Sequence, residues 1–159
     1  MPNITRRFIG HLQTNKVNKC LDLFDTIDSV DSLKLAEKIS NRSSFLNKKT
    51  SILLEINTSG DESKKGFPPN LDDDFYSIFR LDSLKVDGLM TMGPLSQKEN
   101  ETRSAFALLR KIKAKINDQL PGEPIKELSM GMSGDFQIGI EEGSTMIRLG
   151  TAIFGKRNY

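Results

Sequence analysis

The stretch LSMGMSGDFQIGIEEGSTMIRLGTAIFG, residues 128–155, holds the pattern on which the fold depends. It contains two short apolar runs, residues 128–132 and 146–149, that are predicted to be β-strands. Each run ends in a turn of small residues, Ser133-Gly134-Asp135 after the first and Gly150-Thr151 after the second. The same plan of strand and small-residue turn therefore occurs twice in succession.

The segment between the two runs is predicted to be a helix that begins at Asp135. Its apolar residues Phe136 and Ile140, together with Gly139, are expected to face inward. The whole stretch then reads strand, turn, helix, strand, turn, which is the order of a parallel α/β unit.

The two turns have the chemistry of a phosphate-binding cradle. Glycine lets the backbone come close to a ligand and aim N–H groups at it. We expect the hydroxyls of Ser133 and Thr151 and the backbone N–H groups of Gly134, Gly150 and Thr151 to be the donors. A helix N-terminus nearby would also favour an anion. Taken alone, the residues leave open the alternative that these glycines and hydroxyls merely form tight turns.

Composition and charge exclude several classes of protein. The length of 159 residues suits a single domain over residues 1–159, and the formal net charge of +2 gives no sign of a nucleic-acid or membrane partner. One cysteine, Cys20, excludes an internal disulfide framework and fits a reducing compartment. No apolar run approaches the roughly 20 residues of a membrane span, and the first residues lack an apolar signal segment. We therefore expect a cytoplasmic, soluble α/β protein.

Apolar periodicity along the rest of the chain predicts further strands alternating with helices. A turn is expected at residues 28–31, and Ser32 is a candidate N-cap. Such alternation favours parallel strands joined by right-handed helical crossovers. About six strands are two short of a closed (β/α)8 barrel, so an open doubly wound sheet and an incomplete barrel both fit the pattern. The predicted strands are residues 8–12, 24–27, 51–57 and 86–92, and the predicted helices are residues 13–21, 32–39, 71–79 and 98–120.

Six co-linear blocks resemble the pyridoxal 5′-phosphate (PLP) homeostasis protein family, whose barrel is similar to the N-terminal domain of alanine racemase. They follow the family's order and cover nearly the whole chain, which makes the resemblance far more specific than one glycine motif. The blocks are FIGHLQTNK (8–16), IDSVDS (27–32), LLEINTSGDESKKGF (53–67), DGLMTMGP (87–94), LSMGMSGDF (128–136) and GSTMIRLGTAIFG (143–155).

The resemblance implies an α/β fold, namely an incomplete (β/α)8 TIM barrel with the equivalents of strands 3–8. The family's first strand, with the lysine that binds the cofactor aldehyde, has no counterpart, and the family's Trp-His is replaced by Arg6-Arg7. A truncated sequence and a genuine short form both fit this pattern. Free edges are expected at residues 8–12 and 146–149. We therefore expect a marginally stable monomer or a homo-oligomer that pairs these edges.

The resemblance also implies that PLP is the cofactor, here bound non-covalently at most. Ser133, Gly150 and Thr151 would hold its phosphate, and Arg148 would lie beside the pyridine nitrogen. A permanently charged guanidinium disfavours a second positive charge on that nitrogen. The unprotonated ring is a poor electron sink, which suits holding the cofactor rather than using it. The alternative for Arg148 is a surface ion pair.

Three further residues are weaker candidates for cofactor contact. Asn57 and Met90 end predicted strands and could line the mouth of the barrel, although methionines at strand ends usually serve packing. His11, the single histidine, could contact the ring, but a core or rim position is the favoured interpretation.

No catalytic or metal-binding residue is expected. One histidine and one cysteine make a zinc site improbable. Lys16, Lys64 and Lys65 follow strand-like runs, but they are interpreted as solvated, so none is expected to replace the missing lysine. The predicted function is non-catalytic PLP binding in vitamin B6 homeostasis. The alternatives are a fragment of a PLP-dependent racemase-like enzyme and a module that has lost the cofactor.

Overall fold

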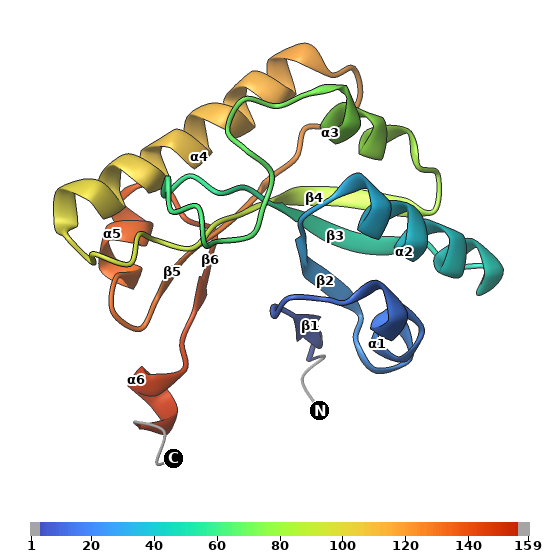
Figure 1. Cartoon of the computed structure of the whole chain (residues 1–159), viewed down its shortest axis with the longest axis horizontal. Coiled ribbons are helices and arrows are strands. Elements are labelled where there is room, and N and C mark those ends of the chain that lie inside the picture. Colours follow the sequence, from blue (N-terminus) through green and yellow to red (C-terminus); the bar gives the residue numbers. More distant parts are fainter. Residues whose placement is uncertain (1–3, 156–159) are drawn as a thin grey trace. The chain divides into compact units, whose positions relative to one another are not determined.

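A computed structural model describes residues 4–155 of the chain (Figure 1). The residues form two compact units, one from Met1–Ile56 and Lys65–Asp87 and the other from Asn57–Lys64 and Gly88–Tyr159. The strands of the described residues follow one another in the sheet in sequence order, β1-β2-β3-β4-β5-β6. Strand β4 (Leu84–Met90) crosses the boundary between the units at Gly88. β1 and β6 are therefore the first and last strands of this order.

The first unit places helices after each of its strands. β1 pairs in parallel with β2, and β2 with β3. The core consists of apolar side chains from these strands and from α2, including Ile27, Ile39 and Leu53. α2 begins where the predicted N-cap Ser32 accepts a hydrogen bond from Leu35 N at 3.4 Å. The elements are β1 (Arg7–Phe8), η1 (Thr14–Lys16), α1 (Val17–Leu23), β2 (Thr26–Val30), α2 (Leu33–Phe45), β3 (Thr50–Glu55), α3 (Asp73–Ser77) and η2 (Ile78–Arg80).

The sequence-based prediction around β2 is wrong. The expected strand at residues 24–27 and turn at 28–31 are one strand, Thr26–Val30. Asp28 lies inside this strand and is fully buried, and its carboxylate accepts a hydrogen bond from Arg7 Nε at 2.8 Å. A buried carboxylate is tolerated where a cation pairs with it, and here the cation comes from the neighbouring strand.

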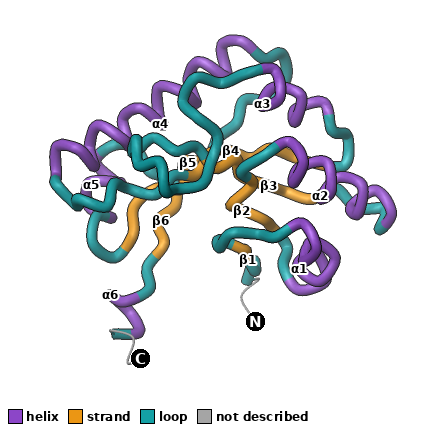
Figure 2. The backbone as a smooth tube through the Cα atoms, in the orientation of Figure 1, coloured by secondary structure: helices purple, strands orange, loops and turns teal. Residues whose placement is uncertain are grey.

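Other strand boundaries shift by a few residues. The apolar run at residues 8–12 contributes only its first residue to β1, because the chain turns at Gly10, whose carbonyl accepts a hydrogen bond from Ser29 Oγ. β3 and β4 each end two residues before the predicted limit, at Glu55 and Met90. A long loop follows β3 and is drawn in teal in Figure 2.

The second unit is built on the end of β4 and on two following strands. β4 pairs in parallel with β5, with Gly88 opposite Glu127, and β5 pairs in parallel with β6. The long helix α4 buries Leu109, Ile112 and Ile116, as its apolar spacing predicts. The elements after β4 are α4 (Glu99–Gln119), β5 (Glu127–Met132), α5 (Phe136–Glu141), β6 (Met146–Arg148) and α6 (Thr151–Phe154).

An ion-pair network joins α5 to α4, which lie side by side in Figure 1. Arg103 on α4 contacts Glu141 at 2.6 Å and Glu142 at 3.1 Å. The carboxylate of Glu141, followed by those of Glu99 and Glu142, raises the pKa of the Arg103 guanidinium above its usual value. The network fixes the short helix that follows the Ser133-Gly134-Asp135 turn.

One predicted core residue of α5 lies outside the core. Gly139 is buried and Phe136 is half-buried, as expected, but Ile140 is 55% exposed. α5 approaches β5 through the face that carries Gly139, and the next residue along the helix consequently points to solvent.

No helix within residues 4–155 combines the length and the apolar character that crossing a bilayer requires. The interpretation of residues 1–159 as a single domain stays a prediction, as do the cytoplasmic location and the pairing of free edges.

Candidate functional site

The two small-residue turns of the second unit lie next to each other at the carboxyl ends of β5 and β6. Ser133 Oγ accepts hydrogen bonds from Gly150 N at 3.0 Å and from Ala152 N at 3.2 Å. Two backbone N–H groups therefore point at one oxygen, which is the arrangement of an anion-binding nest. Open space remains where a Cβ would lie on Gly134 and on Gly150. The two turns therefore bring exposed glycines and backbone N–H groups together around the Ser133 hydroxyl.

A bulge in β5 sets the direction of the Ser133-Gly134-Asp135 turn. Gly131 has a φ of +97°, and the pairing of β5 with β6 shifts register between Ser129 and Met132. Asp135 then closes the turn, since its Oδ1 accepts a hydrogen bond from Met132 N at 2.6 Å while its own N–H donates to Met132 O at 3.0 Å. The turn that carries Ser133 is thus fixed on both sides.

Arg148 lies at the end of β6, with its guanidinium across the ends of two neighbouring strands. Nη1 donates to Ser129 O at 2.9 Å and to Ser129 Oγ at 2.6 Å, and Nη2 donates to Thr91 O at 2.8 Å. Ser129 is fully buried and Thr91 nearly so. These three bonds fix the plane of the guanidinium against Ser129 of β5 and Thr91 after β4. Sequence reasoning missed Ser129 and Thr91, because a hydroxyl residue inside an apolar strand carries no distinctive signal.

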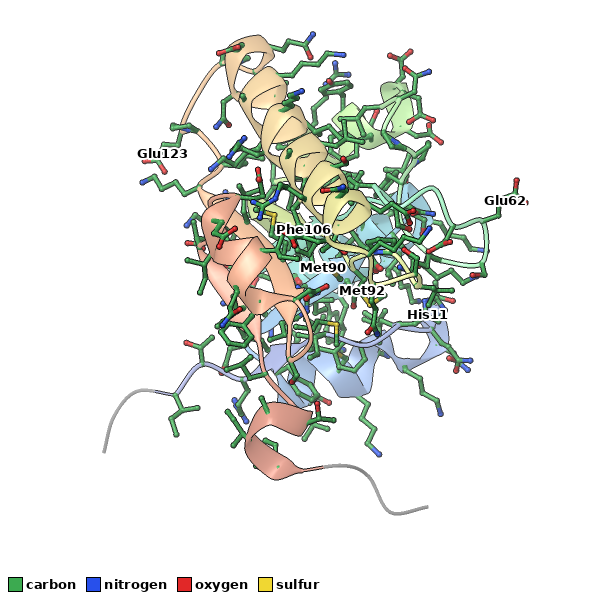
Figure 3. The ribbon with its side chains drawn as sticks, turned by 90° about the vertical axis from the view of Figure 1, so that its left-hand side faces the viewer. His11, Glu62, Met90, Met92, Phe106 and Glu123 are labelled. Atoms are coloured by element: carbon green, nitrogen blue, oxygen red, sulfur yellow. The ribbon has the colours of Figure 1, made fainter. Side chains whose placement is uncertain are left out.

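Asn57 and Met90 also belong to the second unit. The Asn57 amide donates to Asp61 O at 2.8 Å, so it folds the loop Asn57–Lys64. Met90 is 1% exposed and packs in the core. Figure 3 labels Met90, the last residue of β4, together with Met92 two residues beyond it and Phe106 of α4. Among these, Met92 at 38% exposure is the methionine that reaches the surface.

The interpretation of Lys64 as a solvated lysine is wrong. Its side chain is only 12% exposed, its Nζ donates a hydrogen bond to Gly93 O, and Asp61 Oδ2 lies 3.4 Å away. The loop is also joined to the end of β4 by a hydrogen bond of 2.9 Å between Thr58 Oγ1 and Thr91 Oγ1. Lys16 and Lys65 are exposed, as expected.

The charge on Asp61 is expected to stabilise this loop in a pH-dependent way. The backbone N–H of Leu95, and then Lys64, lower the pKa of Asp61. A carboxylate with a lowered folded-state pKa contributes stability above its unfolded pKa, and this contribution is lost as pH falls through the folded value, here below about pH 4. Urea unfolding of the natural chain and of Asp61→Asn should differ most at pH 6, and the difference should shrink as the pH is lowered below about 4. A difference that stays constant over this range would contradict the prediction.

His11 lies in the first unit, at the surface. Its Nδ1 is 3.2 Å from Asp31 Oδ2, and half of the side chain is exposed. Together with Gln13 and Ser32 it lines a surface cleft. A core position for His11 is therefore wrong, and a rim position fits its exposure. No cluster of three or more potential metal ligands of the His, Cys, Asp and Glu type occurs within residues 4–155.

Comparison with known proteins identifies the family to which the chain belongs. The family model described as "Alanine racemase, N-terminal domain" matches residues 5–158. The pyridoxal phosphate homeostasis protein of Synechocystis sp. is 41% identical over 156 residues, which are 98% of this chain and 71% of that protein. The chain belongs to the pyridoxal phosphate homeostasis protein family.

Other members of the pyridoxal phosphate homeostasis protein family extend the comparison. The human protein is 40% identical over 99% of this chain, which spans 60% of the human protein. PipY of Synechococcus elongatus PCC7942, solved without PLP, superposes with a TM-score of 0.90 at 36% identity over 98% of this chain and 73% of PipY. The PipY structure with PLP bound gives a TM-score of 0.85 at 34% identity over 98% and 72%. These matches confirm the α/β fold as an incomplete alanine-racemase-like barrel.

Proposed function

We propose that this chain binds pyridoxal 5′-phosphate and serves in PLP homeostasis without catalysing a reaction. The observation that carries the proposal is the convergence of the Gly150 and Ala152 N–H groups on Ser133 Oγ beside the fixed guanidinium of Arg148. Membership of the pyridoxal phosphate homeostasis protein family, and the PLP found in PipY, support the choice of ligand.

The residues of the second unit would meet the phosphate and the ring nitrogen of the cofactor. The hydroxyls of Ser133 and Thr151 and the backbone N–H groups of Gly134 and Gly150 would hold the phosphate. PLP supplies an aldehyde and an electron-withdrawing ring when it is bound. Arg148 would keep the ring nitrogen unprotonated, because its permanent charge opposes a second cation nearby. The chain would therefore hold the ring and weaken its power to stabilise carbanions.

The remaining candidates have lesser roles in this proposal. The folded loop that Asn57 organises and the buried side chain of Met90 would shape the site. His11, which lies exposed in the first unit, remains a candidate for ring contact on the sequence alone. The binding would be non-covalent at Lys64, since its ammonium group is engaged by Gly93 O and Asp61.

Equilibrium dialysis against PLP, with pyridoxal as the matched ligand that lacks the phosphate, tests this function. We expect PLP to be retained and pyridoxal to be retained at least about tenfold less, because charge-assisted bonds to the phosphate are lost. Borohydride treatment followed by mass spectrometry should add no cofactor mass. Equal retention of both ligands, or none of PLP, would refute the proposal, and turnover in an amino-acid racemase assay would refute its non-catalytic part.

A further inference from the structure

The surface cleft beside His11 has the size and position of a small-molecule site. Its volume is about 410 Å³, and ligand pockets span roughly 300–1,000 Å³. Its lining residues follow the carboxyl ends of β1 and β2, a parallel pair, and ligands of parallel α/β sheets commonly bind at this end. The proposed function makes no use of this cleft, which lies wholly within the first unit.

The lining combines buried apolar side chains with exposed polar ones. Leu12 is 3% exposed and Leu35 is 1% exposed. Gln13, Thr14 and Asn15 are exposed, and among the described residues their side chains form no hydrogen bond. The cleft therefore offers a ligand both apolar contact and hydrogen-bonding groups that are not already engaged.

Asp31 adds a largely buried carboxylate to this lining. Its side chain is 11% exposed, and its ion-pair partner within residues 4–155 is His11, whose Nδ1 lies 3.2 Å from Oδ2. An imidazole carries charge only when it is protonated, whereas Asp28 in β2 is paired with the permanent charge of Arg7 at 2.8 Å. A carboxylate removed from water is stabilised by a cation, so the cleft is suited to a positively charged ligand.

We propose that this cleft binds a small primary amine with an apolar body. The ammonium group would donate to Asp31 Oδ2 in place of His11 Nδ1, through a charge-assisted hydrogen bond. The apolar body would lie on Leu12 and Leu35. The proposal goes beyond the proposed function and is independent of it, because none of these residues belongs to the second unit.

Asp31 and His11 have opposite roles in this proposal. Asp31 holds the ligand, whereas His11 occupies the same carboxylate oxygen in the absence of ligand. Loss of the Asp31 charge should therefore weaken amine binding. Replacement of His11 should leave binding unchanged or make it tighter, because a competing donor is removed.

The first test titrates isobutylammonium chloride into the natural chain in an amine-free buffer at neutral pH, with methyl-labelled leucine and isoleucine observed by NMR. The methyl signals of Leu12 and Leu35 should shift and saturate at millimolar concentration, as expected for so small a ligand. The methyl signals of Ile140, in the second unit, should not move. Isobutanol and isobutyrate have a similar shape with a neutral or a negative head group, and each should bind at least about tenfold more weakly.

The second test repeats the titration with three variants. Asp31→Asn keeps an acceptor for Ser32 Oγ but not the charge, and it should bind isobutylammonium at least about tenfold more weakly. His11→Gln should bind it at least as tightly as the natural chain. Glu37→Gln removes a negative charge from an exposed position of α2 and should stay within about twofold.

Three results would overturn the inference. They are the absence of a saturable shift with isobutylammonium, equal binding of the three ligands by the natural chain, and unchanged affinity in Asp31→Asn. Circular dichroism shows whether Asp31→Asn is folded; if it is not, the comparison of the three ligands still decides. None of these results bears on the retention of PLP, so failure of one proposal leaves the other standing.

Discussion

Replacing Gly88 with alanine is expected to lower the free energy of unfolding by about 3 kcal/mol. Gly88 is buried in β4, opposite Glu127 of β5. A Cβ at this position would overlap the carbonyl oxygen of Glu127 and lie 2.6 Å from its carbonyl carbon. Backbone atoms of a paired strand can yield only if the strand itself moves, and that movement would disturb the pairing of β4 with β5.

Urea unfolding followed by circular dichroism measures this effect, and Gly10→Ala is the matched control. A Cβ on Gly10 would approach only the ring of Phe8, at 3.9 Å. Its substitution should change the free energy of unfolding by less than about 1 kcal/mol. If both variants unfold at the same urea concentration as the natural chain, the close approach of β4 and β5 at Gly88 is wrong.

Replacing Arg148 with methionine should affect both the fold and the proposed ligand. The three acceptor oxygens on Ser129 and Thr91 would lose their donor. Each buried acceptor left unpaired lowers the free energy of unfolding by about 1–3 kcal/mol. In the proposed complex, removal of the guanidinium should raise the pKa of the PLP ring nitrogen, because the opposing positive charge is gone.

Nitrogen-15 NMR of ring-labelled PLP across a pH series reports the protonation of that nitrogen directly. Arg148→Lys is the control, since it keeps the positive charge but not the planar fork of donors. We expect the lysine variant to retain a lower pKa of the ring nitrogen than the methionine variant, with a comparable loss of stability. Identical titration of the nitrogen in all three proteins would show that Arg148 does not face the ring.

Local features of both units could be predicted from sequence. The apolar spacing of α4 and the Ser32 cap of α2 both involve residues within a few positions of one another, and both occur as expected. The resemblance of six blocks to one family likewise predicted the incomplete barrel, which the comparisons confirm.

Burial of polar groups could not be predicted in the same way. Asp28 was assigned to a turn because aspartate is common there, but Arg7 lets it lie inside a strand. Lys64 was assigned to solvent because its neighbours are polar, yet its ammonium group finds Gly93 O and Asp61. Ile140 was assigned to the core by its spacing, although a short helix buries only the face that meets its strand.

The sequence by itself determined the alternation of strands and helices, which turns carry glycine and hydroxyl groups, and which family the chain resembles, because these properties depend on neighbouring residues. Tertiary structure alone decided that Ser133 meets the Gly150 turn, that Arg148 reaches Thr91 and that Asp28 is buried. The partners in these contacts are 17, 57 and 21 residues apart in sequence. Contacts over such separations form because parallel pairing brings strands that are distant in sequence next to one another.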